Sequence, residues 1–190
     1  NAERLEDAID VLKQVILQDN TSKVAYRQLA KAYDRAEMFQ QASESYEELF
    51  KLDPRDFRVA IQVSEVNIAG GNFGKAMRWA EKAITSSKSG VAYAQRGNVY
   101  YKAFQECRSS DISVDDRIVA SLAHESFTVA EENDYSRFHN SLVWLEENEV
   151  LFGRSQWFML DANKKKQGYV KPGSECYKWV EKKLDKDPNW

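Results

Sequence analysis

Small residues recur at a fixed interval through the first half of the sequence. Ala8, Ala42 and Ala76 lie 34 residues apart, and Leu29 and Val63 keep the same step. A period of this length is typical of proteins built from stacked helix–turn–helix repeats. Each such unit buries its apolar face only against its neighbours. The period therefore predicts an all-α solenoid rather than a fold built around one central sheet.

The clearest copy of the repeat covers residues 23–56. Each half carries apolar residues three or four positions apart, which places them on one face of a helix. A turn is expected near Glu37 and Met38. Pro54 ends the second helix, because proline cannot continue a helix and restricts the residue before it. The apolar positions of the two predicted helices are Tyr26, Leu29, Ala30 and Tyr33, then Phe39, Ala42, Tyr46 and Leu49.

This copy resembles the tetratricopeptide repeat (TPR). Ala30 and Ala42 fall where that family needs close approach of helices, and Tyr33 and Pro54 fall on other signature positions. A looser copy follows at residues 57–89, with helices expected over 57–69 and from Phe73 to about Thr85. In this copy Asn67 replaces the usual tyrosine and Lys88 the usual proline. The resemblance implies a solenoid of about three and a half repeats.

The third repeat, residues 90–133, is enlarged. Tyr100 and Ala123 lie 23 residues apart, whereas the corresponding Tyr33 and Ala42 lie 9 apart. We expect the extra residues to lengthen both helices around a loop at 107–113. Ser113 followed by Asp116 forms the pattern of a capping box, which predicts the start of the second long helix.

The two ends of the sequence depart from the repeat. Residues 3–22 match only the second helix of a TPR, which predicts a truncated first repeat whose exposed face could pack on a second copy in a crystal or a dimer. A capping helix is expected over residues 135–148, in the segment 134–148. Residues 149–190 form an aromatic tail, for which the sequence predicts a β-hairpin pairing 168–170 with 175–183.

The region from Gly90 to Leu184 also resembles a Bacteroidetes-type subgroup of bacterial TPR proteins. The resemblance rests on residues 115–127, which read DDRIVASLAHESF, followed by the short aromatic tail. This subgroup implies no activity that could be transferred to the chain, and the compartment stays open, with a bacterial cell envelope favoured.

The sequence offers little support for catalysis or for nucleic-acid binding. Lys and Arg number 27 and Asp and Glu 30, so the net charge of −3 gives no general attraction to phosphate. The two histidines, His124 and His139, are expected within helices, and no signature of an enzyme, a metal site or a cofactor site is present. We therefore predict a non-enzyme without metal or cofactor, and find no transmembrane segment.

Two further features leave alternatives open. Cys107 and Cys176 could pair with each other, but two free thiols are favoured because so few cysteines do not make a disulfide scaffold. The run Lys164–Lys166 near Trp157 could bind nucleic acid or anionic lipid, although a solvated loop is favoured.

The TPR resemblance implies a concave groove that binds a peptide or a partner helix. Its basic residues would favour an acidic partner segment, because guanidinium groups pair well with carboxylates. One alternative is that the chain is a structural segment of a longer solenoid in a cell-envelope complex and makes its contacts through the insertion and the tail. The other is that it is a regulatory module of an upstream enzyme. The positions that would line the groove are Arg27, Gln28, Lys31, Arg35, Arg58, Gln62, Glu65, Gln95, Asn98, Tyr101 and Lys102.

Overall fold

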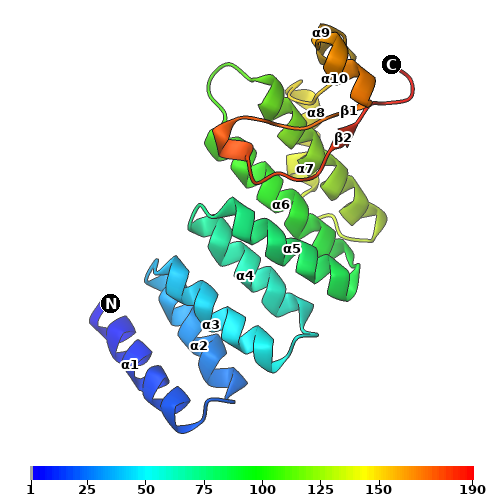
Figure 1. Ribbon diagram of the computed structural model, residues 1–190. Helices are drawn as coiled ribbons and strands as arrows, with labels where there is room; N and C mark the ends of the chain where they lie inside the picture. The colour runs from blue at the N-terminus through cyan, green and yellow to red at the C-terminus, as the bar shows by residue number, and fades with distance from the viewer. Residues whose placement is uncertain (1) are drawn as a thin grey trace. The chain divides into compact units, whose positions relative to one another are not determined.

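The computed structural model describes residues 2–190 and is built almost wholly from helices (Figure 1). It confirms the predicted all-α TPR solenoid with a small two-stranded hairpin near its end.

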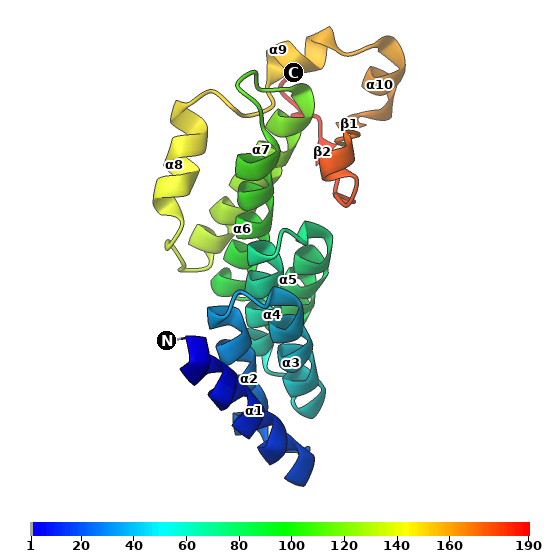
Figure 2. The ribbon, with the colours of Figure 1, turned by 90° about the vertical axis from the view of Figure 1, so that its left-hand side faces the viewer.

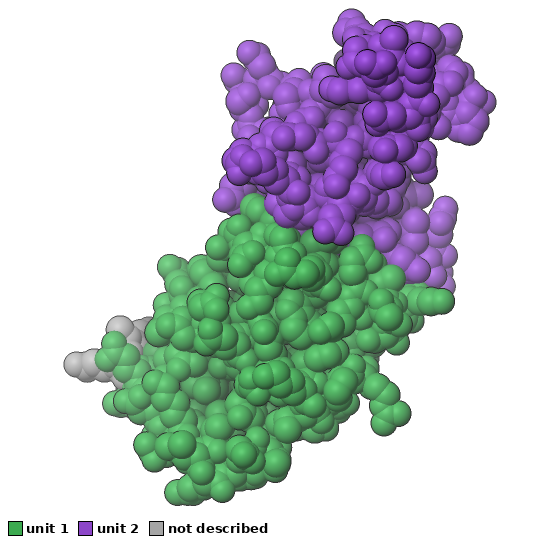
Figure 3. Space-filling view, viewed as in Figure 1, with its two compact units in different colours: residues 1–88 green, residues 89–190 purple. Residues whose placement is uncertain are grey.

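The chain forms two compact units, Asn1–Lys88 and Ser89–Trp190 (Figure 3). Unit 1 contains α1 (Ala2–Gln18), α2 (Lys23–Arg35), α3 (Phe39–Leu52), α4 (Phe57–Ala69) and α5 (Phe73–Ser87). Unit 2 contains α6 (Gly90–Cys107), α7 (Val114–Glu132), α8 (His139–Glu147), α9 (Arg154–Met159), α10 (Ala162–Gln167), β1 (Tyr169–Val170), a short 3-10 helix (Glu175–Tyr177) and β2 (Leu184–Asp185).

Unit 1 is a stack of antiparallel helices that lie side by side in chain order (Figure 2). Side chains cap the helix starts, since Ser22, Asp56 and Asn72 accept backbone N–H groups at the first turns of α2, α4 and α5. Small residues let the helices approach closely, and Ala30 and Ala42 are completely buried. Helix α4 covers the expected residues 57–69, and α5 begins at the expected Phe73 but ends at Ser87, two residues beyond the expected Thr85.

Asn67 connects α3 and α4 at the place where the repeat pattern expects tyrosine. Its side chain is only 4% exposed. The amide Nδ2 donates hydrogen bonds to Ser43 Oγ at 2.8 Å and to the carbonyl oxygen of Val63 at 2.7 Å. A buried amide costs free energy unless it is hydrogen-bonded, so these two bonds explain how the substitution is tolerated.

Unit 2 is centred on the long hairpin of α6 and α7. The predicted capping box is present, because the backbone N–H of Asp116 donates to Ser113 Oγ and the Asp116 carboxylate accepts the N–H of Ser113. Gly97 occupies the small position of α6 and lies against the ring of Phe127 on α7. The insertion expected in this repeat therefore lengthens both helices and keeps their close approach.

We expect Gly97→Ala to destabilise the protein, although alanine favours helices more than glycine. A Cβ at residue 97 would lie 2.5 Å from Cδ1 of Phe127, whose buried ring is itself stacked on Phe138 at 5.0 Å. The overpacking should lower the free energy of unfolding by about 1–3 kcal/mol, less the gain in helix propensity. Urea denaturation measures the loss, and the added substitution Phe127→Leu should recover part of it. Unchanged stability of Gly97→Ala would contradict the packing argument.

The last helix of the repeat region is shorter than expected. The pattern predicted a helix over 135–148, but α8 begins only at His139. The reason is the connection that follows α7. Asp134 has a left-handed φ of 59° there, and the backbone N–H of Tyr135 donates a hydrogen bond to the carbonyl oxygen of Ala130. This turn redirects the chain before the helix can start.

The tail also differs from the prediction. The hairpin forms, but β1 pairs with β2 at 184–185, and Glu175–Tyr177 is a turn of 3-10 helix rather than strand. The intervening segment is held away from β1, since the N–H groups of Gly173 and Ser174 both donate to Asp115 Oδ2. The run Lys164–Lys166, expected to be a solvated loop, lies instead in α10. Asp161 caps the start of this helix, and Gly168, which has a left-handed φ of 73°, ends it.

Cys107 and Cys176 form a disulfide, so the prediction of two free thiols is wrong. Their Cα atoms lie 6.1 Å apart, although 69 positions separate them in the sequence. Close to this bond, Trp179 stacks on Tyr100 of α6 with ring centroids 5.9 Å apart. The disulfide thus fixes the tail to the end of α6, a contact that sequence spacing could not reveal.

Candidate functional site

Two neighbouring polar stripes on unit 1 contain most of the predicted groove residues. On α2, Arg27, Lys31 and Arg35 follow one another at intervals of four, which keeps them on one helix face. Gln28 lies beside them and is exposed. The corresponding stripe on α4 consists of Arg58, Gln62 and Glu65. We call Arg27, Lys31 and Arg35 the α2 stripe, and we call Arg58, Gln62 and Glu65 the α4 stripe.

An ion pair connects the α2 stripe to the residue that caps α4. Arg27 Nη2 lies 3.5 Å from Oδ2 of Asp56, the residue that caps α4. One turn before Arg27, the ammonium of Lys23 is paired with Asp53 at 2.8 Å. The charges of both cations are therefore partly neutralised within the fold, which makes them poorer contacts for an acidic partner than the sequence suggests.

Tyr46 belongs to α3, and charged side chains of both α2 and α4 affect the pKa of its hydroxyl. Burial is the main reason that the pKa of its hydroxyl is raised to about 12. The carboxylates of Asp34 on α2 and Glu65 on α4 add to the shift, while the Arg27 guanidinium opposes it. At neutral pH Tyr46 is therefore an uncharged group between the two stripes.

Three cations of the stripes stay exposed. Within the part of the chain that the structure describes, Lys31, Arg35 and Arg58 form no ion pair, and Arg58 stacks only over the ring of the adjacent Phe57. Gln62 carries a buried side-chain oxygen that has no hydrogen-bond partner in the described residues. These four side chains have hydrogen-bonding or charge-pairing capacity that the fold leaves unused.

The predicted groove residues on α6 lie in a different setting. Gln95 is only 4% exposed, so its side chain belongs to the interior. Tyr101 is half-buried, and its ring contacts those of Phe127 and Trp144 at 6.0 and 6.4 Å. Asn98 is half-buried, and Lys102 is exposed and donates to Gln105. On unit 2 the predicted aromatic contact thus serves packing between α6, α7 and α8.

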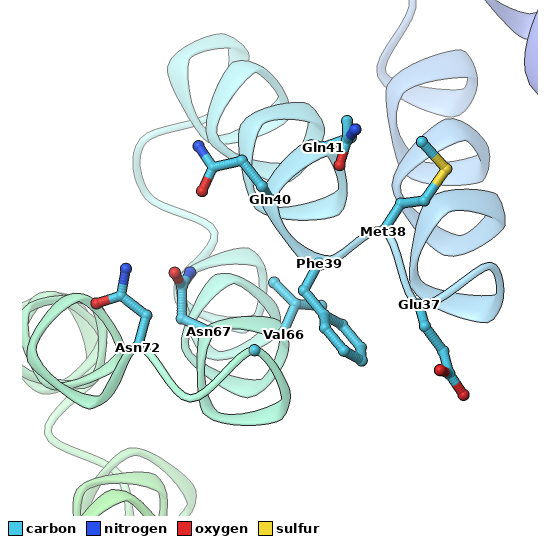
Figure 4. A pocket seen from close by; sticks show the side chains of 9 residues that line it. Glu37, Met38, Phe39, Gln40, Gln41, Val66, Asn67 and Asn72 are labelled. Atoms are coloured by element: carbon cyan, nitrogen blue, oxygen red, sulfur yellow. The ribbon is translucent and has the colours of Figure 1, made fainter.

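A cavity that the sequence analysis missed opens beside Asn67 in unit 1 (Figure 4). Its volume is about 350 Å³. The carboxamides of Gln40, Asn67 and Asn72 lie along one side, and Phe39 and Val66 lie on the other. The signal was present in the sequence, because asparagine is much smaller than the tyrosine that the repeat pattern expects at this position.

Both histidines form structural pairs between α7 and α8. His124 on α7 contacts Glu146 on α8 at 2.7 Å, and His139 on α8 contacts Glu131 on α7 at 2.8 Å. Over residues 2–190 no three His, Cys, Asp or Glu side chains are grouped so that they could hold a metal ion. None of the helices described has the length and apolar character needed to cross a membrane.

Comparison with known proteins supports the fold. No protein-family model and no curated protein matches the sequence. Among solved structures, the chain is similar to MamA MSR-1 C2, with a TM-score of 0.52 and 14% sequence identity over 69% of this chain and 68% of that one. A crystal structure of MamA has a TM-score of 0.47 and 20% identity over 77% of this chain and 91% of that one. At such low identity the likeness concerns architecture alone, and the chain has the fold of a TPR solenoid.

Proposed function

We propose that this protein is a non-catalytic interaction module that binds an acidic segment of a partner protein along the α2 and α4 stripes. The observation that carries the proposal is the set of exposed, unpaired cations Lys31, Arg35 and Arg58 on two helix faces joined by the Arg27–Asp56 ion pair. Guanidinium groups form paired hydrogen bonds with carboxylates, so such a surface selects acidic ligands.

The rigidity of the stack supports this function. Each stripe lies on a helix whose opposite face is buried, with Leu29 and Ala30 on α2 and Val59 and Val63 on α4. A surface that is already ordered before binding loses little conformational entropy when the partner docks. The unpaired oxygen of Gln62 adds an acceptor that a backbone N–H of the partner could reach after rotation of the side chain.

The test uses fluorescence anisotropy with a labelled peptide rich in Asp and Glu, beside the same peptide with Asn and Gln in their place. We expect the unaltered protein to prefer the acidic peptide. The variant Lys31→Glu/Arg35→Glu/Arg58→Glu should bind it at least about tenfold more weakly, since each lost charged contact contributes on the order of 1 kcal/mol.

The matched control is Lys13→Glu/Lys51→Glu/Lys88→Glu, which makes the same change in net charge at exposed lysines of unit 1 outside the stripes. Arg27 is left unaltered because its loss would break the ion pair with Asp56. Equal weakening by the two triple variants would show that only overall charge matters. That result, or equal affinity for the two peptides, would overturn the proposal.

A further inference from the structure

The segment Arg154–Gln167 of unit 2 combines exposed apolar side chains with a concentration of positive charge. We call it the α9–α10 tip. Within unit 2, Figure 2 shows α9 beyond one end of α7, and α10 on the side of α7 away from α8. Met159 is 84% exposed, the largest fraction among the large apolar residues described, and the adjacent Phe158 is 54% exposed. Exposed apolar side chains that adjoin one another and are rimmed by polar residues mark protein or membrane contact sites.

The tip is held in place from within. Trp157, one residue before the exposed pair, is buried and packs against Trp190 with ring centroids 6.2 Å apart. The ammonium of Lys165 donates to the carbonyl oxygen of Phe158 at 2.6 Å, which ties α10 to the end of α9. Phe158 and Met159 are therefore exposed at the end of a helix that is itself held in place.

Positive charge surrounds the exposed pair. The guanidinium of Arg154 lies 5.5 Å from the centroid of the Phe158 ring, and α10 carries Lys164, Lys165 and Lys166 without burying any side chain. Lys171 lines the same cavity as Lys164. The acidic residue in this segment is Asp161, whose carboxylate caps α10 by accepting the N–H groups of Asn163 and Lys164. The tip is thus strongly basic on a chain whose net charge is −3.

We propose that the α9–α10 tip docks the protein on the surface of an anionic phospholipid bilayer. Phe158 and Met159 would enter the interface between headgroups and acyl chains, and Arg154 and the lysines of α10 would contact lipid phosphates. Lysine and arginine clusters beside exposed apolar side chains are the combination that peripheral proteins use to bind such surfaces.

A bilayer fits the tip better than an acidic protein does. A stable protein interface needs a complementary patch of about 800 Å² on each partner. The tip instead presents two apolar side chains at the end of α9, and a lipid surface can admit them without a matching shape. The proposal is independent of the α2 and α4 stripes, which belong to the other unit.

The test is co-sedimentation with lipid vesicles, using phosphatidylcholine alone and phosphatidylcholine mixed with about one third phosphatidylglycerol, a charge density near that of anionic leaflets. We expect binding only to the mixed vesicles and loss of binding at high salt, because salt screens exposed charges. Lys164→Gln/Lys166→Gln, which leaves the hydrogen bond from Lys165 to Phe158 in place, should lower the partition coefficient by about tenfold or more. Phe158→Ser/Met159→Ser should also lower it, since burial of apolar area drives the insertion.

The matched control is Lys13→Gln/Lys51→Gln, which has the same net charge as the α10 variant and should bind like the unaltered protein. Circular dichroism and thermal unfolding show that each variant is folded. Failure of the unaltered protein to bind the mixed vesicles would overturn the proposal. It would also be overturned if the α10 variant and the control bound equally, or if the tip captured only an acidic peptide and no vesicles.

Discussion

Removal of the disulfide by Cys107→Ser/Cys176→Ser is expected to lower the free energy of unfolding by about 4 kcal/mol. The bond closes a loop across a sequence separation of 69 residues, and the chain-entropy model gives this size of effect for such a loop. The loss corresponds to a fall in melting temperature of roughly 10 °C for a protein of this size.

Differential scanning calorimetry with and without a reductant measures this effect. The reductant should lower the melting temperature of the unaltered protein and leave that of the double serine variant unchanged, which controls for effects of the reductant elsewhere. The tail from Gly173 to Leu184 should become sensitive to protease in the reduced protein, because the covalent tie to α6 is gone. Equal melting temperatures in the two conditions would show that the tail is held by its other contacts alone.

Disulfides of this kind persist in oxidising compartments, so the oxidised protein is the relevant reference state there.

Replacement of Asp116 by alanine should destabilise the protein by about 3 kcal/mol. The buried carboxylate has two functions, since it completes the capping box of α7 and accepts a hydrogen bond from the hydroxyl of Tyr177 at 2.6 Å. Loss of a cap costs about 1 kcal/mol, and a buried hydroxyl left without its partner costs about 1–3 kcal/mol more. Burial and then the hydrogen bond to Asp116 raise the pKa of the Tyr177 hydroxyl, so it stays protonated and able to donate.

A double-mutant cycle separates the two functions of Asp116. Tyr177→Phe alone should cost about 1 kcal/mol, because it removes the hydrogen bond and leaves the cap in place. The double variant Asp116→Ala/Tyr177→Phe should be less destabilised than the sum of the single variants, since no hydroxyl is then stranded. Strict additivity in urea denaturation would mean that the hydrogen bond contributes little to stability.

Most of the repeat architecture could be predicted from the sequence alone. The 34-residue spacing of Ala8, Ala42 and Ala76 determined the helix order of unit 1, because each repeat packs only against its neighbours and the same small positions recur. The capping box at Ser113 determined where α7 begins, since it depends on residues three positions apart. The polar stripes of α2 and α4 were likewise determined by helical spacing.

Contacts between distant parts of the chain were decided only in the tertiary structure. The pairing of Cys107 with Cys176 and the partner strand of β1 both depend on how the tail folds back on the α6–α7 hairpin. The burial of Gln95 is likewise a property of the folded chain that helical spacing does not predict. The pairing of Arg27 with Asp56, which removes one cation from the predicted groove, depends on the packing of α2 against its neighbours. Local periodicity carries no information about such contacts, because burial and charge pairing arise when segments far apart in sequence meet. For the same reason Lys164–Lys166, read in the sequence as a solvated loop, became a helix beside two exposed apolar side chains only once the chain had folded.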